Sequence, residues 1–289
     1  MMIMDLYSED GTPSIRVGVI GTCRLDAPLK TLLDSERAQI LWFHSGFAHS
    51  IHDAAQWVAI IRGEKSIPEH LCPFIFGHPI EKLFEGGGSA QNLLEGRSLF
   101  GTIDVLVIEL STKNRVHIDD YDINSNYLGT HLLRPGGIQM LDWWSAVCRD
   151  ERPLPEELEL LVESAAELDI ISSEHLRTMV SQCRRTIDVN HLVVESISQI
   201  NDILPNVESV IISNPDPMNA ELAAYLADTA SSTKMFRFLD PNSLIGDMEP
   251  SEVFKGGGKD LNHYKDSFSP IMAEHIRHFI FSDSQTSIF

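Results

Sequence analysis

The stretch from Asp104 to Leu110 reads DVLVIEL, and it decides the fold that we expect for this chain. Its apolar run is nearly continuous and rich in β-branched side chains, which predicts a strand that is buried on both faces. Strands of this kind occur in parallel sheets that helices cover on each side. The stretch therefore predicts an α/β protein with a parallel sheet at its centre.

Shorter apolar runs elsewhere in the chain predict the other strands of this sheet. They are residues 15–20 (IRVGVI), 39–43 (QILWF), 208–213 (ESVIIS) and 234–239 (KMFRFL). Helical patterns separate these runs, and Asp26 is the expected cap of the first helix. Five strands that alternate with helices indicate a three-layer α/β/α sandwich with a five-stranded parallel sheet. We expect a single domain over residues 1–289, with a mainly helical insertion at about 138–204.

The composition excludes several classes of function. The chain has 22 basic and 42 acidic residues, a net charge of −20, so it would repel nucleic acid and anionic membranes. No stretch approaches the length of apolar sequence that a membrane span needs. The four cysteines form no C-x-x-C pair, and the N-terminal residues contain no basic signal segment. These features predict a cytoplasmic protein that binds neither nucleic acid nor membranes.

The loop after the first strand contains a candidate nucleophile. It reads Gly21-Thr22-Cys23-Arg24 and leads into the first helix. A cysteine at a helix N-terminus beside an arginine is expected to favour the reactive thiolate. In such sheets the ligand site lies beyond the carboxyl ends of the strands, which is where Cys23 is expected. The alternative is that Cys23 is a small buried hydrophobic residue.

A candidate base lies near the last helix, in the sequence Asp260-Leu261-Asn262-His263-Tyr264. A carboxylate three residues before a histidine can hold the imidazole in one tautomer, which leaves its other nitrogen free to take a proton. The alternative is a loop aspartate that caps a turn beside an exposed histidine.

Together, the Gly-x-Cys turn after the first strand and the late Asp-x-x-His pair resemble the SGNH/GDSL hydrolase superfamily. The resemblance implies an α/β/α sandwich of flavodoxin-like type and a triad of Cys23, His263 and Asp260, with cysteine in place of the usual serine. It also implies an oxyanion hole formed by the backbone N–H groups of Cys23 and Gly46. Asn114 or Ser111 would be a third donor, because the family's Gly-x-Asn-Asp block is altered here.

Other residues near these motifs have weaker roles. Arg24 and Tyr264 are candidate substrate contacts. The group of His44, His49, His52 and Asp53 suggests a metal site, but no further ligand follows at a suitable spacing, so we expect no metal. The adjacent Trp143 and Trp144 are expected either to pack the helical insertion or to line a substrate pocket.

Three functions follow from this interpretation. The first is hydrolysis of an acyl ester or thioester through a thioester on Cys23, with no cofactor. The alternative is acyl transfer from an acyl-CoA to a sugar hydroxyl or amine, with coenzyme A as the acyl donor. A second alternative is a non-catalytic binding module that keeps the fold. The partner would be a small acyl substrate, which the resemblance links to carbohydrates, and the sequence leaves the acyl group and the oligomeric state open.

Overall fold

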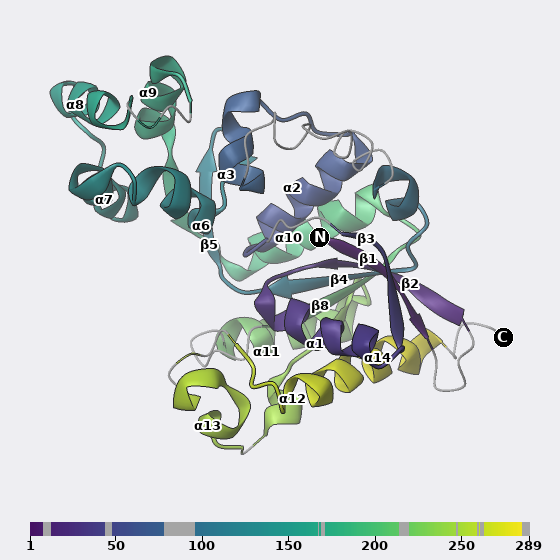
Figure 1. Cartoon of the computed structure of the whole chain (residues 1–289). Coiled ribbons are helices and arrows are strands. Elements are labelled where there is room, and N and C mark those ends of the chain that lie inside the picture. The colour runs from purple at the N-terminus through teal and green to yellow at the C-terminus, as the bar shows by residue number, and fades with distance from the viewer. Residues whose placement is uncertain are drawn as a thin grey trace.

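The main sheet of the computed structural model contains six strands in the order β3-β1-β2-β4-β8-β9 (Figure 1). Their bounds are β1 (Met2–Tyr7), β2 (Pro13–Ile20), β3 (Ala38–Phe43), β4 (Val105–Leu110), β8 (Glu208–Ser213) and β9 (Arg237–Leu239). β2, β4, β8 and β9 are parallel, whereas β1 is antiparallel to both of its neighbours. The structure describes residues 1–7, 13–43, 48–77, 96–166, 168, 171–213, 220–246, 248–258, 260 and 263–284.

The prediction of an α/β fold is confirmed, but the prediction of a five-stranded parallel sheet is wrong. All five predicted strands form, and β1 is inserted as a sixth strand between β3 and β2. Its sequence, MIMDLY, contains one β-branched residue and lacks the run of Val and Ile that marks β4. Ile3, Met4 and Leu6 are fully buried because neighbouring strands and helices enclose β1.

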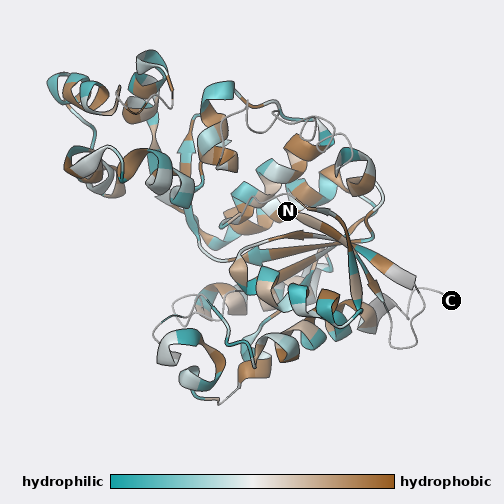
Figure 2. Ribbon diagram, viewed as in Figure 1, coloured by the Kyte–Doolittle hydropathy of each residue, from teal (hydrophilic) through white to brown (hydrophobic). Residues whose placement is uncertain are grey.

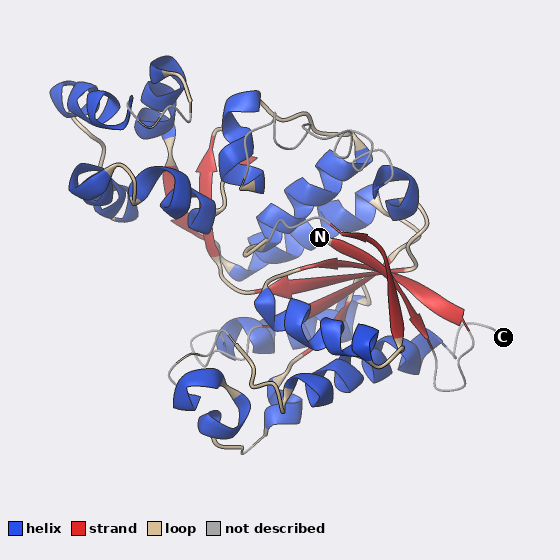
Figure 3. Ribbon diagram, in the orientation of Figure 1, coloured by secondary structure: helices blue, strands red, loops and turns tan. Residues whose placement is uncertain are grey.

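Helices cover both faces of the main sheet, as Figures 1 and 3 show. α2 (Ile51–Arg62), α10 (Asn190–Ile203) and α11 (Ala220–Thr233) share one apolar core with the sheet. α1 (Cys23–Asp34) and α14 (Ser269–Ser284) pack on the opposite face, in a second core. Figure 2 shows the hydrophobic strands between helices whose outer surfaces are more hydrophilic, which is the pattern expected of a covered sheet.

Residues 114–187 form an excursion from the main sheet, and we use that name for them below. It contains a small sheet of β6 (Tyr121–Asp122), β5 (Asn114–Ile118) and β7 (Arg184–Ile187). Its helical elements are α6 (Ser125–Leu128), the π-helical turn η2 (Gly129–Leu133), α7 (Gly137–Cys148), α8 (Pro155–Ala166) and α9 (Ser173–Gln182). In Figure 1, α7, α8 and α9 project away from the main sheet.

The excursion and the predicted helical insertion overlap without coinciding. α7, α8 and α9 lie within 138–204, but so does α10, which packs against α2 in the core of the main sheet. The division into one domain with an insertion remains a prediction.

Short helical elements complete the described chain. They are η1 (Glu69–Leu71), α3 (Cys72–Phe76), α12 (Asn242–Ile245), α13 (Pro250–Val253) and η4 (Lys255–Gly258). Among all the described helices, none has both the length and the apolar character needed to traverse a lipid bilayer.

Candidate active site

A cleft of about 750 Å³ opens at the carboxyl edge of the main sheet, where β2 and β4 end. When β1 is set aside, β3 lies on one side of β2 and the later strands lie on the other. The strand order therefore reverses at β2, and ligands bind at such reversals in open α/β sheets. The cleft is lined by Thr22, Cys23, Arg24, His49, Asp53, Ser111, Thr112, Asn114, Val116, Ile123, Ser125, Asn126, Trp144, Cys148, Arg185 and His263.

Glu109 organises the loop that carries Cys23. The backbone N–H of Thr22 donates to Glu109 Oε2 at 2.8 Å, and the Thr22 hydroxyl lies 2.7 Å from both carboxylate oxygens. Arg24 Nε donates to Glu109 Oε1 at 3.0 Å, and the side chains of Glu109 and Arg24 are 1% and 6% exposed. A buried charge is stable only when it is paired and hydrogen-bonded, and Glu109 meets both conditions.

Glu109 was not predicted as a site residue, although the sequence contains a signal for it. A glutamate within an otherwise apolar buried strand is uncommon unless a partner neutralises it. The close approach of β4 to the loop after β2 also explains the glycine at position 21, because a Cβ there would lie 2.9 Å from the Cβ of Glu109. The sequence motif around Cys23 therefore has a structural counterpart on β4.

α1 begins at Cys23, with Thr22 rather than the predicted Asp26 as its N-cap. Asp26 lies in the first turn and pairs with Lys30 at 2.6 Å. The Thr22 side chain makes no capping bond, because its hydroxyl turns toward Glu109. Cys23 is thus the first residue of the helix, at the end whose dipole favours negative charge.

The expected fall in the pKa of Cys23 is not found. Partial burial, followed by the Glu109 carboxylate, raises the pKa of the Cys23 thiol above its ordinary value. Arg24 and hydrogen bonding act in the opposite direction but are outweighed. At neutral pH the sulfur is therefore a protonated thiol, and it needs a base in order to react.

A histidine with an orienting carboxylate lies on the same cleft. His263 lines the cleft, and its Nδ1 lies 2.7 Å from Asp260 Oδ2. This contact is the one that the Asp-x-x-His spacing predicts, and it leaves Nε2 as the nitrogen that is free for proton transfer. Both side chains are about half exposed, at 50% for His263 and 40% for Asp260.

The two predicted substrate contacts have different outcomes. Arg24 lines the cleft while it pairs with Glu109. Tyr264 was expected beside the substrate, but it is 3% exposed and its ring packs between Phe254 and Phe268. Tyr264 is therefore a core residue, whereas its neighbour His263 lines the cleft.

The predicted oxyanion donors also separate. Gly46 lies outside the described residues. Ser111 lines the cleft, but its hydroxyl donates to Glu109 at 2.9 Å and its backbone N–H donates to the His49 carbonyl. Asn114 lines the cleft, and its side-chain oxygen accepts a 2.9 Å hydrogen bond from Arg185. The hydrogen bonds that Ser111 donates to Glu109 and His49 do not favour it as a donor to the oxyanion. The hydrogen bond from Arg185 fixes the orientation of the Asn114 amide.

The described histidines near α2, His49 and His52, have different partners, and His44 lies outside the described residues. His49 lines the cleft, and its Nε2 lies 2.9 Å from Asn126 Nδ2. His52 turns away toward Asp188, at 2.7 Å, and Ser196. Asp53 caps α2 through Ser50, and burial raises the pKa of its carboxyl to about 7.

The two tryptophans divide between the two roles considered for them. Trp143 is buried at 4% exposure, and its Nε1 donates to the Val180 carbonyl at 3.1 Å, so it packs α7 against α9. Trp144 instead lines the cleft. The excursion thus contributes the aromatic side chain of Trp144 to the lining of the cleft.

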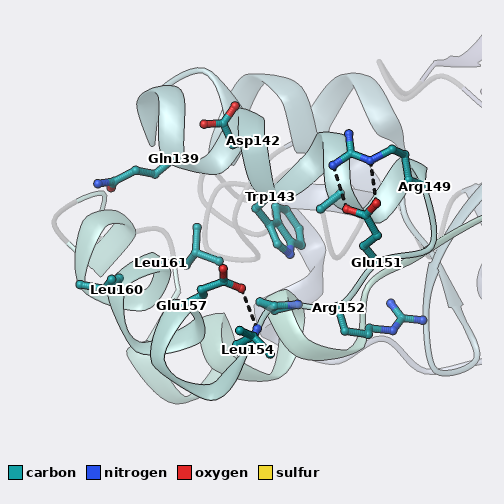
Figure 4. A pocket seen from close by; sticks show the side chains of 12 residues that line it. Gln139, Asp142, Trp143, Arg149, Glu151, Arg152, Leu154, Glu157, Leu160 and Leu161 are labelled. Carbon is teal, nitrogen blue, oxygen red and sulfur yellow. Dashed lines mark hydrogen bonds and ion pairs between the residues drawn. The ribbon is translucent and has the colours of Figure 1, made fainter.

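A second hollow, of about 630 Å³, lies between α7 and α8 (Figure 4). Three of its charged groups already have partners: Arg149 pairs with Glu151 at 2.8 Å, and Glu157 accepts from the backbone N–H of Leu154 at 2.8 Å. Its described lining contains no cysteine, serine or histidine. The described lining of the hollow therefore offers no thiol, serine hydroxyl or imidazole, and the cleft at the sheet edge is the better candidate for an active site.

Comparison with known proteins adds two findings. The family described as the TviD N-terminal domain matches residues 15–279 of the chain. The Vi polysaccharide biosynthesis protein TviD of Salmonella typhi is 21% identical over 276 residues, which are 92% of this chain and 31% of that protein. The chain thus spans less than a third of the length of this relative. No solved structure matches the chain.

Proposed function

Since the chain belongs to the TviD N-terminal domain family, we propose that it is an acyltransferase that modifies a carbohydrate through an acyl-thioester on Cys23. One observation carries the proposal: Cys23 and His263 line the same cleft at the carboxyl edge of the sheet, and His263 is hydrogen-bonded to Asp260. A thiol, a base and an orienting carboxylate are the groups that covalent acyl transfer requires.

In the first step, the Cys23 sulfur attacks the carbonyl carbon of the acyl donor while His263 Nε2 takes the thiol proton. The coupling of the two events follows from the raised pKa of Cys23, which keeps the resting sulfur protonated. The tetrahedral oxyanion is stabilised by the backbone N–H of Cys23 at the N-terminus of α1. The bond between the carbonyl carbon and the leaving group then breaks, and His263 returns the proton to the leaving group.

In the second step, a sugar hydroxyl or amine attacks the carbonyl carbon of the thioester. His263 takes the proton of the attacking group, the carbon–sulfur bond breaks, and the Cys23 thiolate regains that proton. The acyl group ends on the acceptor, and the enzyme returns to its starting form. With a coenzyme A donor, the leaving group of the first step is the free thiol.

Transfer is favoured over hydrolysis for two reasons. The relative is named for polysaccharide biosynthesis, which points to a sugar acceptor rather than water. The cleft also has room for an acceptor, with Trp144 and Asn126 on the side that the excursion contributes. Aromatic side chains suit the apolar faces of sugar rings, and side-chain amides suit their hydroxyl groups.

An SGNH-type sandwich remains part of this proposal. It is supported by the position of the nucleophile loop after β2 and by the Asp260–His263 pair before α14. The sixth strand β1 is a departure from the pattern that the resemblance implies.

The proposal is tested by intact-mass measurement after the protein is mixed with acetyl-CoA, with and without sugar acceptors. We expect an acetyl adduct that maps to Cys23, is discharged faster when acceptor is present, and is absent from Cys23→Ala. Discharge to water at the same rate with or without acceptor would support a hydrolase instead. Absence of any adduct, with acetyl-CoA or with an activated ester, would support the non-catalytic binding module.

A further inference from the structure

Arg185 presents a positive charge to the cleft without a neutralising carboxylate. It lies on β7, paired with Val116 of β5, and its Nη2 donates to the Asn114 side-chain oxygen at 2.9 Å. Within the described ranges of the chain, no carboxylate forms an ion pair with Arg185. The amide of Asn114 orients the guanidinium but leaves its charge unbalanced.

The surroundings make this charge unusual. The protein has a net charge of −20, yet the described lining of the cleft contains two arginines and a single carboxyl group, that of Asp53. Arg24 is compensated by Glu109, and burial raises the pKa of the Asp53 carboxyl to about 7, so that this group is only partly ionised near neutral pH. Arg185 is therefore the arginine of the described cleft lining whose charge no carboxylate balances, on an acidic molecule, and such a charge attracts anions.

Arg185 and the catalytic groups come from different parts of the fold. Cys23 begins α1 and His263 precedes α14, whereas Arg185, Asn126 and Trp144 belong to the excursion. The part of the cleft lining that the excursion contributes thus includes a guanidinium, an amide and an indole. A guanidinium binds carboxylate and phosphate through paired hydrogen bonds, and an indole offers a flat surface to a ring.

We propose that Arg185 anchors an anionic group, a carboxylate or a phosphate, of a substrate that lies across the cleft against Trp144. This inference rests on the proposed acyl transfer for its role in the reaction, but not for the binding itself. The anion has two possible sources with the same chemistry: the carboxylate of an acidic sugar acceptor, or a phosphate of a nucleotide-containing acyl donor. Arg185 is a binding residue that selects substrates by charge and takes no part in bond making.

The test compares wild type, Arg185→Gln and Arg177→Gln by binding calorimetry. Arg177 is the matched control, because it is exposed, pairs with Glu159 at 2.7 Å on the surface of the excursion and does not line the cleft. The probes are digalacturonate and its neutral counterpart Gal-α1,4-Gal for the acceptor, and coenzyme A and pantetheine for the donor. A lost hydrogen bond to a charged group corresponds to a decrease in affinity of about tenfold to hundredfold.

The expected result is a decrease of that size for one anionic probe in Arg185→Gln only, with its neutral counterpart unchanged. Loss for digalacturonate assigns the anion to the acceptor, and loss for coenzyme A assigns it to the donor. Arg185→Lys should retain part of the affinity, since lysine keeps the positive charge but not the paired N–H donors of the guanidinium. Equal binding by all three proteins, or no binding of either anionic probe to wild type, overturns the proposal.

These outcomes are independent of catalysis. If Cys23 forms no adduct while Arg185→Gln still loses an anionic probe, the acyl-transfer proposal fails and the anion site stands. If Cys23 is acylated and transfers its group while Arg185→Gln binds both anionic probes like wild type, the anion site fails and acyl transfer stands.

Discussion

Replacement of Glu109 by glutamine should destabilise the protein and at the same time make Cys23 more reactive. Glu109 accepts hydrogen bonds from the Thr22 backbone, the Thr22 hydroxyl, Arg24 and Ser111. A glutamine can accept through one oxygen only, so at least one of these donors would face an NH₂ group. Arg24, 6% exposed, would also lose its counter-charge.

The magnitude follows from these contacts. Breaking a buried ion pair by removing one partner costs about 3–5 kcal/mol, because the remaining charge is left buried and unpaired. The second effect has the opposite sign. The Glu109 carboxylate raises the pKa of Cys23 and Arg24 lowers it, so the loss of Glu109 alone should lower the pKa of this thiol. More thiolate would then be present at neutral pH.

Two measurements check this prediction. Urea unfolding gives the difference in free energy, and iodoacetamide labelling at pH 7 with peptide mass spectrometry gives the rate at Cys23. Cys183 is the internal control, because it is fully buried and is labelled only when the structure opens. The double variant Glu109→Gln/Arg24→Gln should recover part of the lost stability. A loss below about 1 kcal/mol, or slower labelling of Cys23, would refute the argument from the buried pair.

Three further changes have defined outcomes. The folded-state pKa of Asp53, about 7, lies above its ordinary value of 3.8, so its contribution to stability is full below pH 3.8 and is lost as the pH rises through 7. Urea unfolding should therefore show wild type losing up to about 4 kcal/mol relative to Asp53→Asn between pH 4 and pH 8. A difference that does not change with pH would contradict this expectation. Trp143→Ala should lower the free energy of unfolding by about 3–5 kcal/mol, because it empties a buried site, whereas Trp144→Ala should leave stability within about 1 kcal/mol and instead weaken binding of the sugar acceptor. Gly21→Ala should lower the free energy of unfolding by about 1–3 kcal/mol, since its Cβ would lie 2.8 Å from Leu25 and 2.9 Å from Glu109; a melting temperature equal to that of wild type would contradict the close approach.

Much of the fold could be predicted from local sequence patterns. The apolar run at 105–110 and its four shorter counterparts became strands, and helices formed between them as the helical patterns predict. These patterns are local, because a residue buried in a sheet or on a helix face must be apolar wherever the chain leads. β1 was missed because nothing in MIMDLY distinguishes a strand from another apolar segment. Its place between β3 and β2 depends on hydrogen bonds to residues far along the chain.

The candidate site shows the same division between local and distant information. The sequence by itself predicted the Asp260–His263 contact, because a spacing of three residues lets the carboxylate reach the ring, and it placed Cys23 at the sheet edge, because a residue directly after a parallel strand lies there. Only the tertiary structure decided the raised pKa of Cys23, which comes first from burial and then from the Glu109 carboxylate on β4, and the approach of Arg185 from β7. Electrostatic interactions depend on distance through space rather than along the chain, so no local pattern contains them.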